Sequence, residues 1–219
     1  MTDLKMMKNL GVLISGAEMT SDLPEIDLLG SFAAAQEDYR ALVLIHTWVQ
    51  RNHDLIHVEA LLSKLKNTKA SGPLKLLAGA LKATGQKRFD RILDLAKASK
   101  SKPTLNKYLS FATEIGQCST DPAYAEFGLT ISCIDLAAER KYRPRKFMIA
   151  FNPFFFCRTL FGVNWRADVA ACFLTDNAKN PTEVAKFIGC SYDAAYRNYH
   201  DLLSVGWDKD VRKSFVSGL

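Results

Sequence analysis

Histidines are the residues of this chain whose spacing first suggests metal chemistry. His53 and His57 stand four positions apart, which is the spacing of the two zinc ligands on one helix of zinc proteases. Those enzymes carry a glutamate directly after the first histidine, whereas Asp54 follows His53 here and no further ligand is evident. We therefore expect structural or interfacial roles for these histidines and for the earlier His46, and we predict no metal site.

Nucleophilic and nucleotide chemistry have no better support in the sequence. The five cysteines are odd in number and contain no C-x-x-C pair, which argues against a disulfide framework and against a zinc site. No G-x-S-x-G motif is present. The glycines of "GVLISGAE" have the spacing of a phosphate-binding loop, but Ala17 and Glu18 stand where that loop needs lysine and a hydroxyl. The sequence therefore predicts a protein that is not an enzyme, binds no cofactor and keeps its thiols reduced and buried.

The net charge of +6 is unevenly distributed along the chain. Residues 1–63 carry four basic and nine acidic groups, whereas residues 64–107 carry twelve basic groups and two aspartates. A second cluster, "RKYRPRK" at 140–146, holds five basic residues in seven positions. Such asymmetry indicates an anionic partner, of which nucleic acid is the commonest. The alternative is a solvated lysine-rich face without a partner.

Length and composition indicate one large globular domain or two small ones. Hydrophobic residues make up 48% and charged residues 24% of the 219 positions, which is the ordinary globular range. Apolar runs such as "ALVLIHTWV" break too soon to span a bilayer, and the N-terminal run is too short and too weakly flanked for a secretory signal. We expect a cytoplasmic protein without a membrane segment.

The elements that would position functional residues are predicted to be mainly α-helical. Residues 1–28 lack a sustained period and predict an irregular arm, while residues 29–146 predict a helical domain that carries the basic surface and a candidate dimerisation interface. A boundary near 144–153 separates this domain from a second one at 147–219. The helices expected in the first domain cover residues 31–49, 55–66, 73–84, 87–99 and 104–116.

Two short helices joined by a tight turn are predicted between residues 180 and 206. Asn180 as an N-cap, Pro181 at the first helical position and Glu183 in the first turn mark the start of the first helix. Gly189 is expected to end it in a left-handed conformation, and Ser191 to cap the second helix. An upstream helix in "WRADVAACFLTDN" should pack on both. The residues expected to be buried in the pair are Val184, Ala185, Phe187, Ile188, Ala195, Tyr199 and Leu202.

Residues 160–207 resemble the winged helix-turn-helix domain of bacterial transcriptional regulators. The resemblance covers roughly a quarter of the chain and rests on a small residue in the second helix, a glycine turn, a serine cap and a closing glycine before the wing. It implies a mainly α fold with a small β wing after Trp207, in which the helix 191–204 enters the major groove of duplex DNA. The matching positions are Ala185, Gly189, Ser191, Ala195, Tyr199, Leu202 and Gly206, with tyrosine at 199 where the family more often has leucine.

The DNA contacts implied by this resemblance divide into base reading and phosphate binding. Arg197 can donate two hydrogen bonds to a guanine edge, and Asn198 can pair with an adenine. Tyr192 and Tyr196 can contact a phosphate or a thymine methyl, and His200 shares their face of the helix. The residues expected at phosphates are Ser191 at the helix N-terminus, Lys186, Lys209, Arg212 and Lys213.

The sequence therefore predicts a transcriptional regulator that binds double-stranded DNA as a homodimer. One alternative is a protein-interaction scaffold that uses the winged helix and the aromatic stretch 154–161. A second is sequence-independent nucleic-acid binding through the basic residues of 64–107 and 140–146. Asp193 and Asp201, on or near the reading helix, repel phosphate and weigh against the DNA interpretation.

Overall fold

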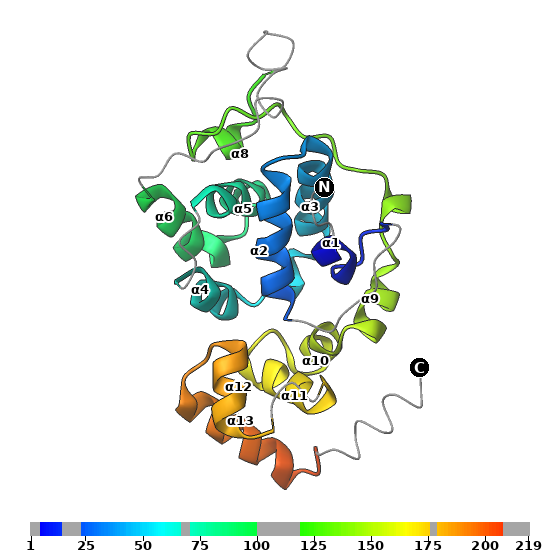
Figure 1. Cartoon of the computed structure of the whole chain (residues 1–219), viewed down its shortest axis with the longest axis vertical. Helices are drawn as coiled ribbons and strands as arrows, with labels where there is room; N and C mark the ends of the chain where they lie inside the picture. Colours follow the sequence, from blue (N-terminus) through cyan, green and yellow to red (C-terminus); the bar gives the residue numbers. More distant parts are fainter. Residues whose placement is uncertain (1–4, 15–22, 67–70, 100–118, 176–178, 208–219) are drawn as a thin grey trace. The chain divides into compact units, whose positions relative to one another are not determined.

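The computed structural model of the chain describes residues 5–14, 23–66, 71–99, 119–175 and 179–207. The chain divides into two compact units: unit 1 comprises Met1–His53 and Leu65–Arg143, and unit 2 comprises Asp54–Lys64 and Pro144–Leu219. Both units are built from helices, so the expected mainly α-helical class is confirmed (Figure 1). Among the described residues, no helix combines the length and the apolar character needed to cross a membrane.

Unit 1 is organised around three helices that pack against one another. α2 (Pro24–Ala35) contacts both α3 (Tyr39–Asn52) and α5 (Ser71–Ala83), and α3 also contacts α5 (Figure 1). The Trp48 side chain of α3 is fully buried, and its indole nitrogen donates to the Leu10 carbonyl over 2.5 Å. The remaining elements of this unit are α1 (Lys5–Asn9), η1 (His53–Leu55, of which His53 belongs to unit 1), η2 (Lys87–Phe89), α6 (Asp90–Ala98), α8 (Pro122–Ala125) and η4 (Glu139–Lys141).

The expectation of an irregular arm over residues 1–28 is wrong where the structure describes helix. α1 covers Lys5–Asn9, and α2 begins at Pro24, whose fixed backbone angle suits the first helical position. The two helices are joined by a buried hydrogen bond of 3.0 Å from the Asn9 side-chain nitrogen, Nδ2, to the Asp27 carboxylate. This bond links residues 18 positions apart, so a local sequence pattern cannot reveal it.

A buried polar pair sits between α3 and α8. The His46 Nδ1 lies 2.8 Å from the Tyr124 hydroxyl, and both side chains are buried. Gly79 of α5 makes room for the tyrosine, because a Cβ added there would lie 2.3 Å from the Tyr124 ring. Burial lowers the pKa of His46 to about 4, since the apolar surroundings disfavour the charged imidazolium.

Unit 2 combines a segment from the first half of the chain with the C-terminal helices. α4 (Val58–Lys66) contributes its residues up to Lys64, and the C-terminal part supplies α9 (Arg145–Phe151), α10 (Pro153–Phe161), α11 (Trp165–Thr175), α12 (Pro181–Ile188) and α13 (Tyr192–Ser204). α10 packs on α9 and on α11, and α11, α12 and α13 contact one another. The predicted bounds of the C-terminal domain, 147–219, therefore omit the segment Asp54–Lys64, which belongs to this unit.

A buried ionic network ties three parts of unit 2 together. The Asp168 carboxylate of α11 accepts from the Arg158 Nε at 2.8 Å and lies 2.5 Å from the His57 Nδ1. Arg158 also donates to the Leu55 carbonyl over 2.9 Å. Desolvation alone raises the pKa of Asp168, but the Arg158 charge and the bond to His57 outweigh it and hold that pKa below its ordinary value. His57 thus has a structural partner, as expected.

β structure is almost absent from the described part of the chain. Its only β-type pairings are two isolated antiparallel bridges, Val12 with Tyr142 and Thr120 with Ser132. The small β wing expected after Trp207 has no support in these residues, and its segment, 208–219, lies outside the described part of the chain. The helix expected over 104–116 lies outside it as well.

Candidate nucleic-acid interface

The first helix of the candidate interface begins as predicted. The Asn180 side chain accepts a hydrogen bond from the Glu183 amide over 3.0 Å, and Pro181 occupies the first turn. The Glu183 carboxylate reaches back to the Lys179 amide over 2.8 Å and to the Asn180 side-chain nitrogen over 3.0 Å. This reciprocal capping satisfies backbone donors that a helix start would otherwise leave without partners.

The turn between α12 and α13 is held from outside by α4. Gly189 adopts the expected left-handed conformation with φ of 84°. Its carbonyl accepts from the Ser63 hydroxyl at 2.6 Å, and the Phe187 carbonyl accepts from the Lys64 ammonium at 2.6 Å. The sequence interpretation missed these two residues, because nothing near 63–64 marks them as partners of a segment about 125 positions away. The Phe187 carbonyl in the last turn of α12 and the Gly189 carbonyl after it are thus paired within unit 2.

Gly189→Ala is expected to destabilise unit 2 by about 1–2 kcal/mol from backbone strain, since side chains other than glycine disfavour the left-handed region. A Cβ at this position would also lie 2.4 Å from the Ser63 oxygen, so the hydroxyl must turn away and lose its bond. Gly206→Ala is the matched control, because Gly206 has φ of 78° and open space around it. Urea denaturation should show a loss about 1 kcal/mol larger for Gly189→Ala. Equal losses would contradict the role given to Ser63.

α13 buries one side as predicted, with one partial exception. Ser191 caps the helix by accepting from the Ala194 amide over 3.2 Å, and Ala195 and Leu202 are fully buried. Tyr199 is only partly buried: its ring stacks on Phe173 with 4.6 Å between centroids, and its hydroxyl donates to the Lys179 carbonyl over 2.8 Å. A tyrosine fits this partly buried position, because its polar end has a hydrogen-bond partner.

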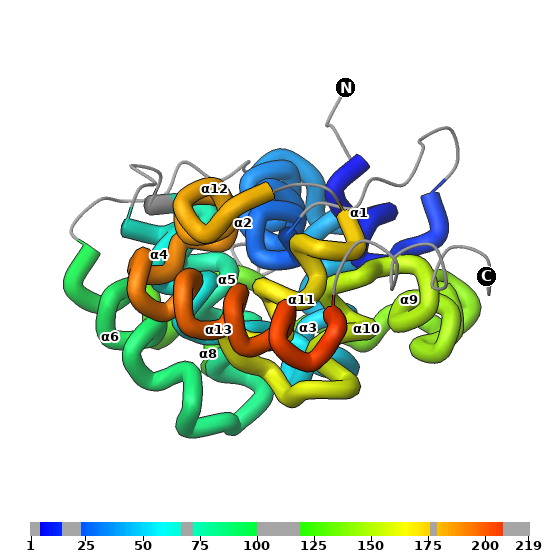
Figure 2. The backbone as a smooth tube through the Cα atoms, turned by 90° about the horizontal axis from the view of Figure 1, so that it is seen from below, coloured from blue at the N-terminus to red at the C-terminus, as the bar shows by residue number. Residues whose placement is uncertain are grey.

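A face of α13 that flanks the buried side presents an aromatic ladder, formed by Tyr192, Tyr196 and His200. Tyr192 and Tyr196 are 53% and 47% exposed, although large aromatic side chains are usually mostly covered. Their ring centroids lie 5.8 Å apart, and the Tyr196 ring lies 4.3 Å from the exposed His200 ring. The spacing of four residues places the three rings along one line of the helix. Figure 2 shows α13 along its length, with α11 and α12 beside it.

The polar residues predicted to read bases differ in how they are presented. Arg197 is exposed, and its Nε donates to the Asp193 carbonyl of the same helix over 3.3 Å. Asn198 is partly buried, and its amide nitrogen donates to the Ala194 carbonyl over 2.8 Å. Because this bond occupies a donor that adenine recognition needs, Asn198 is less well placed for base reading than Arg197.

Charges near α13 give only weak attraction for phosphate. α13 carries one basic residue, Arg197, and two acidic residues, Asp193 and Asp201, and all three are exposed. With histidine counted as neutral, the net charge of the helix is −1. Lys186 of α12 is exposed and available for a phosphate contact. Three further residues predicted at phosphates, Lys209, Arg212 and Lys213, lie outside the described part of the chain.

The three segments named in the alternative interpretations are partly engaged within the protein. In the basic run 64–107, Lys82 and Lys97 both pair with Glu126, at 3.0 Å and 2.6 Å. In the basic cluster 140–146, Arg145 pairs with Asp54 over 3.0 Å. The aromatic stretch 154–161 is only partly accessible: Phe154 and Phe155 are buried, whereas Leu160 near its end is 55% exposed. The buried part of this stretch serves packing and not docking.

The described residues bring no cluster of three or more metal-ligating side chains together. Burial raises the pKa of Cys157 to about 12 and that of Cys190 to about 11, so these two cysteines are protonated and poorly nucleophilic near neutral pH. Comparison of the chain with protein-family models, with curated proteins and with solved structures finds no match.

Proposed function

We propose that unit 2 binds duplex DNA through a helix-turn-helix in which α13 is the reading helix. The observation that carries the proposal is the arrangement of α12 and α13: a serine-capped helix follows a left-handed glycine turn and keeps Tyr192, Tyr196 and Arg197 exposed. Such a helix is narrow enough to enter the major groove and meets the base edges with its N-terminal residues.

The exposed side chains suit both kinds of contact that such a complex needs. Arg197 can donate two hydrogen bonds to a guanine, once its terminal nitrogens turn to the base. Tyr192 and Tyr196 each carry a ring for a thymine methyl and a hydroxyl for a phosphate. Ser191 and the first amides of α13 form a helix N-terminus, where a phosphate is favourably placed.

The weak charge of α13 has a definite consequence for how binding depends on salt. Affinity for DNA falls with salt in proportion to the number of phosphates neutralised. With a helix charge of −1, phosphate neutralisation must come from Lys186 and from other basic residues of the chain. We therefore expect a shallow salt dependence and a large share of the specificity in direct base contacts. Reading of paired half-sites by a homodimer remains part of this proposal.

Arg197→Ala is expected to weaken binding to a selected duplex by about 1–3 kcal/mol, while binding to an unrelated duplex hardly changes. Fluorescence anisotropy with both duplexes measures this difference. Arg91→Ala is the matched control, because it removes the same charge from an exposed position of α6 in unit 1. An equal effect of both variants on both duplexes would favour sequence-independent binding through the basic residues of 64–107.

A protein-docking function is the second candidate, and the aromatic ladder favours it. Tyrosine is enriched at the centres of protein interfaces, whereas charged residues are depleted there. The ladder of Tyr192, Tyr196 and His200 lies on a helix with more acidic than basic groups, which suits a protein partner better than a polyanion. If docking is the function, Tyr196→Ala abolishes capture of that partner, and no duplex shows an Arg197-dependent affinity.

A further inference from the structure

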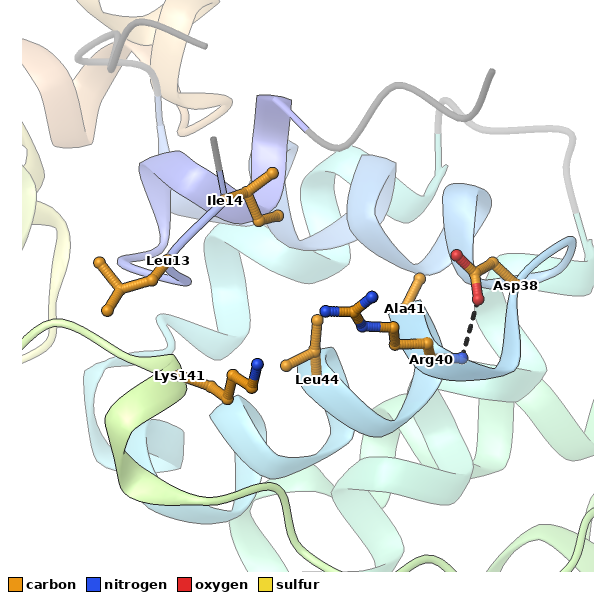
Figure 3. A pocket seen from close by; sticks show the side chains of 7 residues that line it. All are labelled: Leu13, Ile14, Asp38, Arg40, Ala41, Leu44 and Lys141. Atoms are coloured by element: carbon orange, nitrogen blue, oxygen red, sulfur yellow. Dashed lines mark hydrogen bonds between the residues drawn. The ribbon is translucent and has the colours of Figure 1, made fainter. Parts of the chain in front are cut away.

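A pocket in unit 1 has the walls and the charges of a ligand site. Its volume is about 260 Å³, close to the lower end of the range for small-molecule pockets in proteins. It lies beside the start of α3 and is lined by Leu13, Ile14, Asp38, Arg40, Ala41, Leu44 and Lys141 (Figure 3). The apolar residues and the charged residues come from three separate segments, so the fold assembles this pocket from distant parts of the sequence.

The walls of the pocket are fixed by hydrogen bonds to backbone carbonyls. The Leu13 amide donates to the Lys141 carbonyl over 2.8 Å, next to the bridge between Val12 and Tyr142. The Tyr142 hydroxyl donates to the Leu44 carbonyl over 2.9 Å, which ties the same segment to α3. The three lining segments are therefore held together without a ligand, and a site that is already formed costs little ordering on binding.

Two cations face this space. Figure 3 shows the charged ends of Arg40 and Lys141 turned towards the region above Leu44. Within the part of the chain that the structure describes, neither side chain has an ion-pair partner within 4 Å. Among the described lining residues the only acid is Asp38, which caps α3 by accepting from the Arg40 amide over 2.8 Å. The seven described lining residues thus carry two positive charges and one negative charge.

We propose that this pocket binds a small organic anion. Its anionic head lies between the Arg40 guanidinium and the Lys141 ammonium, which are the side chains that recognise carboxylates and phosphates. A short apolar body lies against Leu13, Ile14 and Leu44, because Leu13 is 49% exposed and gains cover from it. The pocket volume accommodates a short apolar body of this kind. The proposal concerns unit 1 alone and does not depend on the proposed DNA binding.

Calorimetric titration of the full chain with hexanoate and with hexyl phosphate tests this site. At least one of them should bind about tenfold more tightly than 1-hexanol, which lacks the charge, and than inorganic phosphate, which lacks the apolar body. Arg40→Gln and Lys141→Gln should each weaken that binding by about tenfold. Both side chains are exposed, so neither change removes packing in the core.

Lys87→Gln is the control, because Lys87 is an exposed lysine of the same unit that does not line the pocket. This variant should bind hexanoate and hexyl phosphate as the unaltered chain does. The proposal is overturned if neither hexanoate nor hexyl phosphate binds, or if Arg40→Gln and Lys141→Gln bind it unchanged. It is also overturned if 1-hexanol binds equally well, which would indicate only an apolar hollow. Equal binding of inorganic phosphate would indicate an adventitious ion only.

Discussion

Asp168→Asn is expected to destabilise unit 2 by about 3–5 kcal/mol, the cost of leaving a buried charge without its partner. The substitution keeps the size and shape of the side chain but removes the negative charge that faces the fully buried Arg158 guanidinium. The asparagine can still accept one hydrogen bond, so the loss measures charge compensation more than packing. Its effect should be among the largest of any single substitution in this unit.

Guanidinium denaturation followed by tryptophan fluorescence measures this loss. Trp165, whose ring lies 4.4 Å from that of His57, reports on unit 2 when Trp48 of unit 1 is replaced by phenylalanine in every sample. Asp193→Asn is the matched control, because it makes the same chemical change at an exposed position of α13. A difference below about 1 kcal/mol between the two variants would mean that Arg158 finds compensation elsewhere.

Acidification is expected to destabilise unit 1 through His46. Its pKa in the folded chain is about 4, against 6.5 for a histidine in water. The unfolded chain therefore takes up this proton at a higher pH than the folded chain does. The stability linked to His46 is complete above pH 6.5 and is lost progressively as the pH falls towards 4. The total loss is up to about 3 kcal/mol.

The measurement compares the free energy of unfolding at neutral pH and near pH 4.5 for the chain and for His46→Asn. The asparagine can still bond to the Tyr124 hydroxyl but cannot titrate, so most of the His46 contribution to the pH dependence should disappear. Trp48 reports on unit 1 when Trp165 and Trp207 are replaced by phenylalanine. His53→Asn serves as the control, since it leaves the buried pair intact. An unchanged pH dependence in His46→Asn would contradict the assignment.

The features predicted correctly from the sequence are those set by neighbouring residues. Asn180, Gly189 and Ser191 act at helix ends, where capping depends on a side chain and on backbone groups two or three positions away. The buried side of α13 follows the helical period, so Ala195 and Leu202 could also be assigned. Local patterns were therefore sufficient for the helix ends and the turn of the candidate interface. They did not fix burial everywhere, because Ala185 and Phe187, which were expected to be buried, are only partly buried.

The features that the sequence did not reveal depend on contacts between distant segments. Ser63 and Lys64 support the turn of the interface from a helix about 125 positions earlier, and His57 joins Asp168 across 111 positions. No periodicity links such pairs. The one signal of the buried ionic network in the sequence was Arg158 within an apolar stretch, because a buried arginine requires an acidic partner. Asn198 shows the same limit for a single side chain. Its bond to the Ala194 carbonyl of its own helix depends on the side-chain rotamer, which the sequence does not determine.

Selection of bound duplexes from a random pool tests the central claim most directly. The full chain and Arg197→Ala are selected in parallel at two salt concentrations. DNA reading by α13 predicts that the full chain enriches a defined motif at both concentrations, and that Arg197→Ala loses the preference at one guanine of that motif while retaining the others. Recovery of no motif above the starting pool at either concentration, or of an identical motif with both proteins, would contradict the claim.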